Sequence, residues 1–179
     1  MDPREHDWPV LESAAEYETP WYTGGYDRVE QPDGSEKDYY WADLPPAAVV
    51  IAVDDGDILF VNQYRPVIRE HCRELPAGIV EDDESFEEAA ARELAEETGF
   101  YPNETELLQR VNASTGVLRH ERGFVYASDL ERDERDLDNN EFLTVDRVPV
   151  EDVLGVAREQ PANDSTVEGV LLARADGYL

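Results

Sequence analysis

Three glutamates lie close together in a segment with helical periodicity, and carboxylates at that spacing could hold a divalent cation. On a helix, Glu93, Glu96 and Glu97 fall within an arc of roughly 100°. Like charges at such spacings destabilise a helix by about 0.2 to 0.5 kcal/mol per pair. Carboxylate oxygens are the ligands that Mg²⁺ and Mn²⁺ prefer, and water and phosphate oxygens can complete the shell. This acidic stripe predicts metal-dependent phosphate chemistry, although a solvated face would also carry carboxylates.

Residues with a defined spacing surround the acidic stripe. Gly78 is followed after five residues by Glu84, and after seven more by an Arg-Glu pair that begins at Arg92. An apolar residue, the adjacent glutamates of the stripe, Gly99 and the apolar Phe100 complete a pattern of 23 positions. This pattern resembles the Nudix box of the Nudix hydrolases. The resemblance implies an α/β (α+β) fold, a Nudix-type α/β/α sandwich with a mixed β-sheet.

The resemblance also implies roles for these residues. The acidic stripe would bind Mg²⁺ or Mn²⁺, with Glu93 and Glu97 as the main ligands and Glu96 as a further one. The carbonyl of Ala77 would join them. Glu84 and Arg92 would brace the loop before the helix, an interaction that their opposite charges favour.

The general base has several candidates. Glu141 stands just before an expected strand, where similar enzymes carry a loop glutamate that completes the metal site or acts as the base. Asn139 stands where some of those enzymes have a second acid. The base is therefore Glu141, Glu96, Glu97 or a neighbouring loop acid such as Asp138.

Two segments are similar to the ADP-ribose pyrophosphatase branch of the family, namely the one around Arg65 and the run Arg73–Gly78. Arg65 is suited to a phosphate because its planar fork donates two hydrogen bonds, and Glu74 can accept from sugar hydroxyls or the adenine amine. Gly116 is retained as a substrate-binding position, whereas Thr115 replaces the proline typical of this branch. The resemblance implies hydrolysis of ADP-ribose to AMP and ribose 5-phosphate.

The same residues could also serve other functions. The substrate could be another nucleotide sugar, a dinucleotide or a nucleoside triphosphate. A nucleotide-sensing module without catalysis would be expected to lack glutamates of the box, and an acidic structural protein would have no defined spacing at residues 78–100. The complete box therefore favours an enzyme.

Local patterns predict the elements that hold these residues. Ser85 and Glu88 form a capping-box pattern for a helix that ends at Gly99. The expected strands are 47–53 and 58–64, joined as a hairpin, and 106–111, 123–128 and 142–148. Further helices are expected at 150–159 and 165–175. Residues 76–78 and 129–141 are expected to be loops.

The organisation predicted is a β-rich segment at residues 1–46, followed by a Nudix domain at 47–179. Turns are expected at 22–25 and 31–34, between aromatic strands. Trp21 or Trp41 could stack on adenine or pack over a sheet. In similar enzymes such strands cross to a second subunit, so the resemblance implies a homodimer.

Composition limits the partners and the setting. There are 43 acidic and 15 basic residues, giving a net charge of −28, which argues against nucleic acid as a partner. Lys37 is the only lysine, a bias that favours a halophilic source. The single cysteine, Cys72, is interpreted as a structural thiol, and His120, which stands between Arg119 and Glu121, is given no role. No apolar run is long enough to span a bilayer, so we expect no membrane association and a cytoplasmic enzyme.

Overall fold

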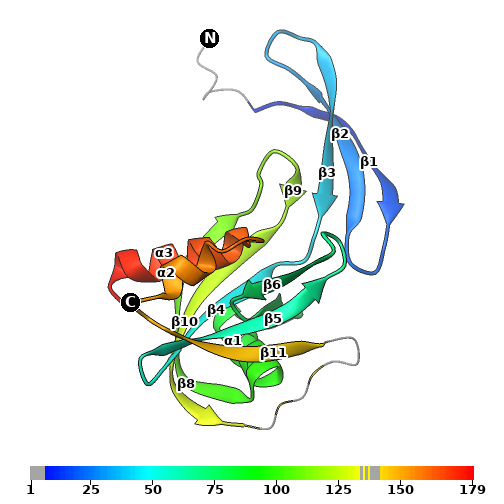
Figure 1. The fold of residues 1–179 in the computed structure, drawn as a ribbon. Coiled ribbons are helices and arrows are strands. Elements are labelled where there is room, and N and C mark those ends of the chain that lie inside the picture. The colour runs from blue at the N-terminus through cyan, green and yellow to red at the C-terminus, as the bar shows by residue number, and fades with distance from the viewer. Residues whose placement is uncertain (1–6, 134, 136, 138–141) are drawn as a thin grey trace. The chain divides into compact units, whose positions relative to one another are not determined.

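The computed structural model describes residues 7–133, 135, 137 and 142–179 (Figure 1). The chain divides into two compact units. The first unit contains the residues up to Pro45 together with Asn112–Glu121, and the second contains Pro46–Val111 and Arg122–Leu179. A segment distant in sequence therefore joins the N-terminal strands.

The first unit is built on a four-stranded sheet with the order β1-β2-β3-β9. The strands are β1 (Val10–Glu18), β2 (Thr23–Glu30), β3 (Glu36–Asp43) and β9 (Leu118–Arg119). A turn follows β2 as expected, with Gly34 donating to the carbonyl of Gln31. The turn expected at residues 22–25 was wrong, because the chain reverses at Thr19–Tyr22 and Gly25 lies inside β2. A Cβ on Gly25 would meet the carbonyl of Ala14 at 2.2 Å, so this glycine permits close strand packing.

The second unit contains a seven-stranded mixed sheet. Its main order is β11-β5-β4-β10-β8, with β6 paired to β5 and β7 paired to β4. The strands are β4 (Ala47–Asp54), β5 (Asp57–Arg65), β6 (Glu70–Glu74), β7 (Ala77–Ile79), β8 (Phe100–Asn112), β10 (Glu121–Arg132) and β11 (Leu143–Pro149). The expected β4–β5 hairpin is confirmed, and Asp55 and Gly56 form its turn with φ values of 51° and 85°. Before this turn, residues 47–52 of β4 pair in parallel with β10.

Helices pack on both faces of this sheet. The helices are α1 (Phe86–Thr98), α2 (Val153–Ala157) and α3 (Asp164–Asp176). Because successive strand residues face opposite sides, β4 contributes to two apolar clusters. Val50 packs in one cluster with Leu94 of α1, and Ile51 packs in the other with Val170 of α3. This layering confirms the predicted α/β/α fold with a mixed sheet.

The structure differs from the expected elements at two loops. Residues 77–79 form β7, because their backbone groups pair with β4 at Ala47–Val49. The charged segment expected as a loop from Asp129 begins as strand, since β10 continues to Arg132. None of the helices in the described part of the chain is long and apolar enough to cross a bilayer.

Candidate metal and substrate site

Helix α1 has both of its ends fixed by local hydrogen bonds. The Ser85 hydroxyl accepts from the Glu88 N–H at 3.1 Å, and the Glu88 carboxylate accepts from the Ser85 N–H at 2.7 Å. The latter bond lowers the pKa of Glu88. Gly99 ends the helix at a φ of 73°, with its N–H bonded to the carbonyl of Ala95. Such caps fix which face of the helix packs against the sheet.

The acidic stripe lies on the side of α1 next to β7. Glu93 and Glu97 are 9% and 3% exposed, which is rare for carboxylates. A Cβ built on Gly78 would lie 1.9 Å from the carboxyl carbon of Glu93, so the carboxylate rests directly on the glycine. The Ala77 N–H donates to Glu97 at 3.1 Å. Two buried carboxylates are thereby held against one short strand.

Arg92 connects the acidic stripe to the preceding loop. Its Nε and Nη2 donate to the two oxygens of Glu84 at 2.8 and 2.9 Å, and Nη2 also donates to the carbonyl of Ile79. Its Nη1 donates to Glu93 at 2.9 Å and to Glu96 at 3.2 Å. These bonds lower the pKa of Glu84 and raise that of Arg92. One guanidinium thus contacts three glutamates and reduces the repulsion among them.

The residues of the stripe suit a divalent cation by donor type and by burial. Their carboxylates are hard oxygen donors on one helix face, and Gly78 leaves room at Glu93 that any side chain would fill. Within the described residues, no three acidic, thiol or imidazole side chains form a gathered ligand set. The reason is visible in the hydrogen bonds, since Glu93 and Glu96 share Arg92 while Glu97 bonds to Ala77.

Arg65 and Glu74 meet at a second polar cluster in the same unit. Glu74 is 3% exposed, accepts a hydrogen bond from Arg65 Nε at 2.8 Å and forms an ion pair with Arg65 Nη2 at 2.6 Å. Gln63 and Asn163 also donate to it, at 3.1 and 2.5 Å. A cavity of about 410 Å³ opens beside this cluster. Cys72 lines the cavity as a buried thiol whose pKa is raised by burial, in keeping with a structural role.

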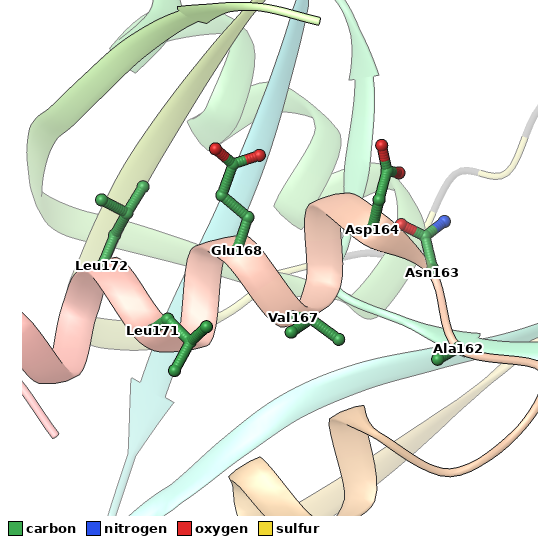
Figure 2. A pocket seen from close by; sticks show the side chains of 7 residues that line it. All are labelled: Ala162, Asn163, Asp164, Val167, Glu168, Leu171 and Leu172. Carbon is green, nitrogen blue, oxygen red and sulfur yellow. The ribbon is translucent and has the colours of Figure 1, made fainter. Parts of the chain in front are cut away.

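A larger cavity of about 570 Å³ follows α3. Figure 2 shows its lining, which includes the large apolar side chains of Val167, Leu171 and Leu172. It shares Asn163 and Asp164 with the smaller cavity, at the start of the helix. No residue of the acidic stripe lines it.

Several predicted site residues lie outside the second unit or outside the described residues. Gly116 belongs to the first unit, where a Cβ would meet no atom within 4 Å. Trp21 and Trp41 belong to that unit as well, and Arg119 covers the ring of Trp41 at 4.0 Å. Glu141, Asp138 and Asn139 lie outside the described residues.

Two residues with a place at these clusters were missed in the sequence. Arg135 donates to the carbonyl of Glu97 at 2.7 Å and to that of Leu143 at 2.9 Å, which supplies the cation that the last turn of α1 lacks. Arg135 lies in a highly charged stretch of the sequence, where nothing distinguishes it from the neighbouring charged residues. Asn163 caps α3 by accepting from the Thr166 N–H, and the known preference for Asn at this position would have identified it.

The chain is similar in sequence and in fold to known proteins. A family model described as NUDIX domain matches residues 43–169. The chain is 32% identical over 140 residues to an ADP-ribose pyrophosphatase of Bacillus subtilis (strain 168), with 76% of each chain covered. It is 31% identical over 142 residues to a methanol dehydrogenase activator of Bacillus methanolicus, covering 78% of this chain and 77% of the relative. A crystal structure of ADP compounds hydrolase superimposes with a TM-score of 0.87 at 20% identity, over 97% of this chain and 98% of that one, which shows a common fold.

Proposed function

Because the chain belongs to the Nudix family, whose model spans residues 43–169, we propose that it hydrolyses ADP-ribose to AMP and ribose 5-phosphate. It is a Nudix hydrolase of the ADP-ribose and ADP-compound pyrophosphatase type. The observation that carries the proposal is the pair of buried carboxylates, Glu93 and Glu97, held against the short strand at Gly78. The relationship to the Bacillus subtilis ADP-ribose pyrophosphatase supports the choice of substrate.

The proposed cofactor is Mg²⁺ or Mn²⁺, bound by the acidic stripe with the carbonyl of Ala77 and, as the resemblance to similar enzymes implies, with Glu141. When bound, such a cation supplies positive charge to the diphosphate and lowers the pKa of water. The donor set supports this assignment, because oxygen ligands match both ions. The cation also explains how a chain of net charge −28 binds an anionic substrate.

The protein's own groups would direct the hydrolysis. Glu97, Glu96, Glu141 or Asp138 takes a proton from the attacking water, whose oxygen forms a bond to one phosphorus. The bond from that phosphorus to the bridging oxygen breaks, and the other phosphate leaves with this oxygen. Arg65, which keeps 45% of its side chain exposed, can pair with a phosphate. Among these groups, Glu97 is held by its bond to Ala77.

Brace residues maintain the alignment of the acidic stripe. Arg92 bonds to both oxygens of Glu84 and to two carboxylates of the stripe, so it joins the loop to the helix. Its fork restricts where Glu93 and Glu96 can lie. We assign Arg92 and Glu84 to positioning within the proposed site.

Hydrolysis of ADP-ribose by purified wild-type protein, with Mg²⁺ and molar salt, tests the proposal. We expect AMP and ribose 5-phosphate in equal amounts, and a fall in kcat on the order of a hundredfold or more in Glu97→Gln and Glu93→Gln. Undiminished turnover in both variants would contradict the assigned site. Faster cleavage of another nucleotide sugar, a dinucleotide or a nucleoside triphosphate would keep the hydrolase but reject ADP-ribose as its preferred substrate.

We also propose that the enzyme is a homodimer that associates through its first unit. Tyr17 and Tyr40 of that unit are 60% and 63% exposed and line one hollow, and large apolar groups gathered on a surface mark interaction sites. Light scattering coupled to size exclusion, at molar salt, measures the mass directly. A monomer at all concentrations tested would reject this assignment.

A further inference from the structure

Glu74 is 3% exposed and its carboxylate already contacts three protein side chains, Gln63, Arg65 and Asn163. We propose that Glu74 is a positioning residue which holds Arg65 and Asn163 on two walls of the 410 Å³ cavity, and that this cavity receives the sugar-phosphate end of the substrate. The inference rests on the proposed hydrolysis of a nucleoside diphosphate sugar.

The carboxylate of Glu74 is occupied by protein donors. It has two oxygens with about four acceptor positions. Arg65 Nε and Gln63 donate to its Oε2, Asn163 donates to its Oε1, and Arg65 Nη2 forms an ion pair with Oε2. The residue is 3% exposed, so little of the carboxylate is open to a ligand. A buried carboxylate with this number of donors serves to fix them.

Arg65 keeps part of its guanidinium for a ligand. Its Nε donates a hydrogen bond to Glu74, its Nη2 forms an ion pair with the same carboxylate, and 45% of its side chain remains exposed. Among the residues that the structure describes, no group accepts a hydrogen bond from its Nη1. The fixed fork therefore presents its remaining N–H groups to the cavity that Arg65 lines.

Asn163 is fixed on the opposite element, helix α3. Its side-chain oxygen accepts from the N–H of Thr166 and the hydroxyl of Ser165, while its amide nitrogen donates to Glu74. Thr166 in turn accepts from the buried N–H of Leu75 at 3.1 Å. The first turn of α3 is thus locked to the strand end that carries Glu74. Figure 2 shows Asn163 and Asp164 together at this start of the helix.

The cavity lies within reach of the acidic stripe. Glu74 precedes Ala77 by three residues, and the Ala77 N–H bonds to Glu97. An extended chain advances about 3.3 Å per residue, so Glu74 lies roughly 10 Å or less from Ala77. A substrate whose diphosphate is at the stripe would place one of its two ends near the cavity.

The lining of the cavity favours a sugar phosphate over a base. None of the described side chains that line it is aromatic, whereas adenine is commonly held by stacking on a ring. Arg65 can bond to a phosphate, and Asn163 and Asp164 can bond to sugar hydroxyls. Val67 and Ile68 supply apolar surface for the face of the sugar ring.

Kinetics of two matched variants test the positioning role. Asn163→Ser keeps an oxygen for the helix cap and removes the amide donor, and Glu74→Gln keeps the shape and removes the charge. We expect KM for ADP-ribose to rise about tenfold in each, with kcat changed by less than about threefold. Glu168→Gln is the control, because Glu168 lies on the same helix but lines only the larger cavity. Unchanged KM in both variants, or a fall confined to kcat, would overturn the proposal.

Side-chain NMR supplies a readout that needs neither turnover nor metal. In the ¹⁵N-labelled full chain, ribose 5-phosphate should shift the Arg65 Nε–H and Asn163 amide resonances, which Arg65→Lys and Asn163→Ser assign, and AMP should not. Shifts with AMP alone, or with neither ligand, would overturn the cavity assignment. If wild-type protein fails to cleave ADP-ribose, the proposed substrate is wrong and these shifts decide the cavity separately. If Glu74→Gln does not fold, Asn163→Ser and the spectra carry the test.

Discussion

At the scale of single residues, Gly78 and the acidic stripe depend on one another. The spacing of the Nudix box required a glycine at position 78. The structure shows that the carboxylate of Glu93 rests on this glycine. The bond from Arg135 to the carbonyl of Glu97 and the bond from Asn163 to the carboxylate of Glu74 could not be predicted in the same way, because each joins residues distant in sequence.

Replacing Gly78 with Ala should displace Glu93. The added Cβ would lie 1.9 Å from the carboxyl carbon, so the side chain must move. We expect a loss of stability of about 1 to 3 kcal/mol from overpacking, and a large loss of activity, measured by urea unfolding and ADP-ribose hydrolysis. Gly155→Ala is the control, because its Cβ meets no atom within 4 Å. Wild-type activity in Gly78→Ala would show that the position of Glu93 is unimportant.

At the scale of elements, α1 and the loop before it act as one piece. The caps at Ser85 and Gly99 were predictable, because they depend on residues only a few positions apart. The short strand β7 was not, since its pairing with β4 joins distant segments. Arg92 and Glu84 close the loop onto the helix through two charge-assisted bonds.

The bond between Arg92 and Glu84 predicts a specific dependence of stability on pH. Arg92 lowers the pKa of Glu84 in the folded protein. The stabilisation is fully present above the unfolded pKa of about 4.3, and it is lost as the pH falls through the lower, folded pKa. Urea unfolding, followed from about pH 6 down to about pH 3, should show a steeper loss of stability with acid in wild type than in Glu84→Gln. Parallel curves would contradict the brace.

At the scale of the whole molecule, the net charge could be predicted from the sequence and the strand order could not. The net charge of −28 follows from composition and required no structure. The strand order β11-β5-β4-β10-β8 and the pairing of Ala42 with Leu118 could not be predicted, because neither is encoded in local patterns. Self-repulsion among so many carboxylates opposes the compact state, and salt screens it.

The melting temperature should therefore rise with salt. Between about 0.1 and 1 M KCl the Debye length falls from about 10 to about 3 Å, which removes most of the surface repulsion. Scanning calorimetry at neutral pH should show this increase. As a control, the increase should shrink near the sequence pI of about 4.1, where the net charge is small. A melting temperature that stays constant or falls with KCl at neutral pH would contradict this interpretation and the halophilic source that it supports.

We propose that the acidic stripe is a metal site and not merely part of a generally acidic surface. Paramagnetic resonance of free Mn²⁺, titrated with protein in molar KCl to screen the general surface charge, tests it most directly. Glu87 lies in the first turn of α1, outside the stripe, so Glu87→Gln is the matched control. We predict tight Mn²⁺ binding in wild type and Glu87→Gln, weakened on the order of a hundredfold in Glu97→Gln. Equal Mn²⁺ binding by all three proteins would contradict the claim.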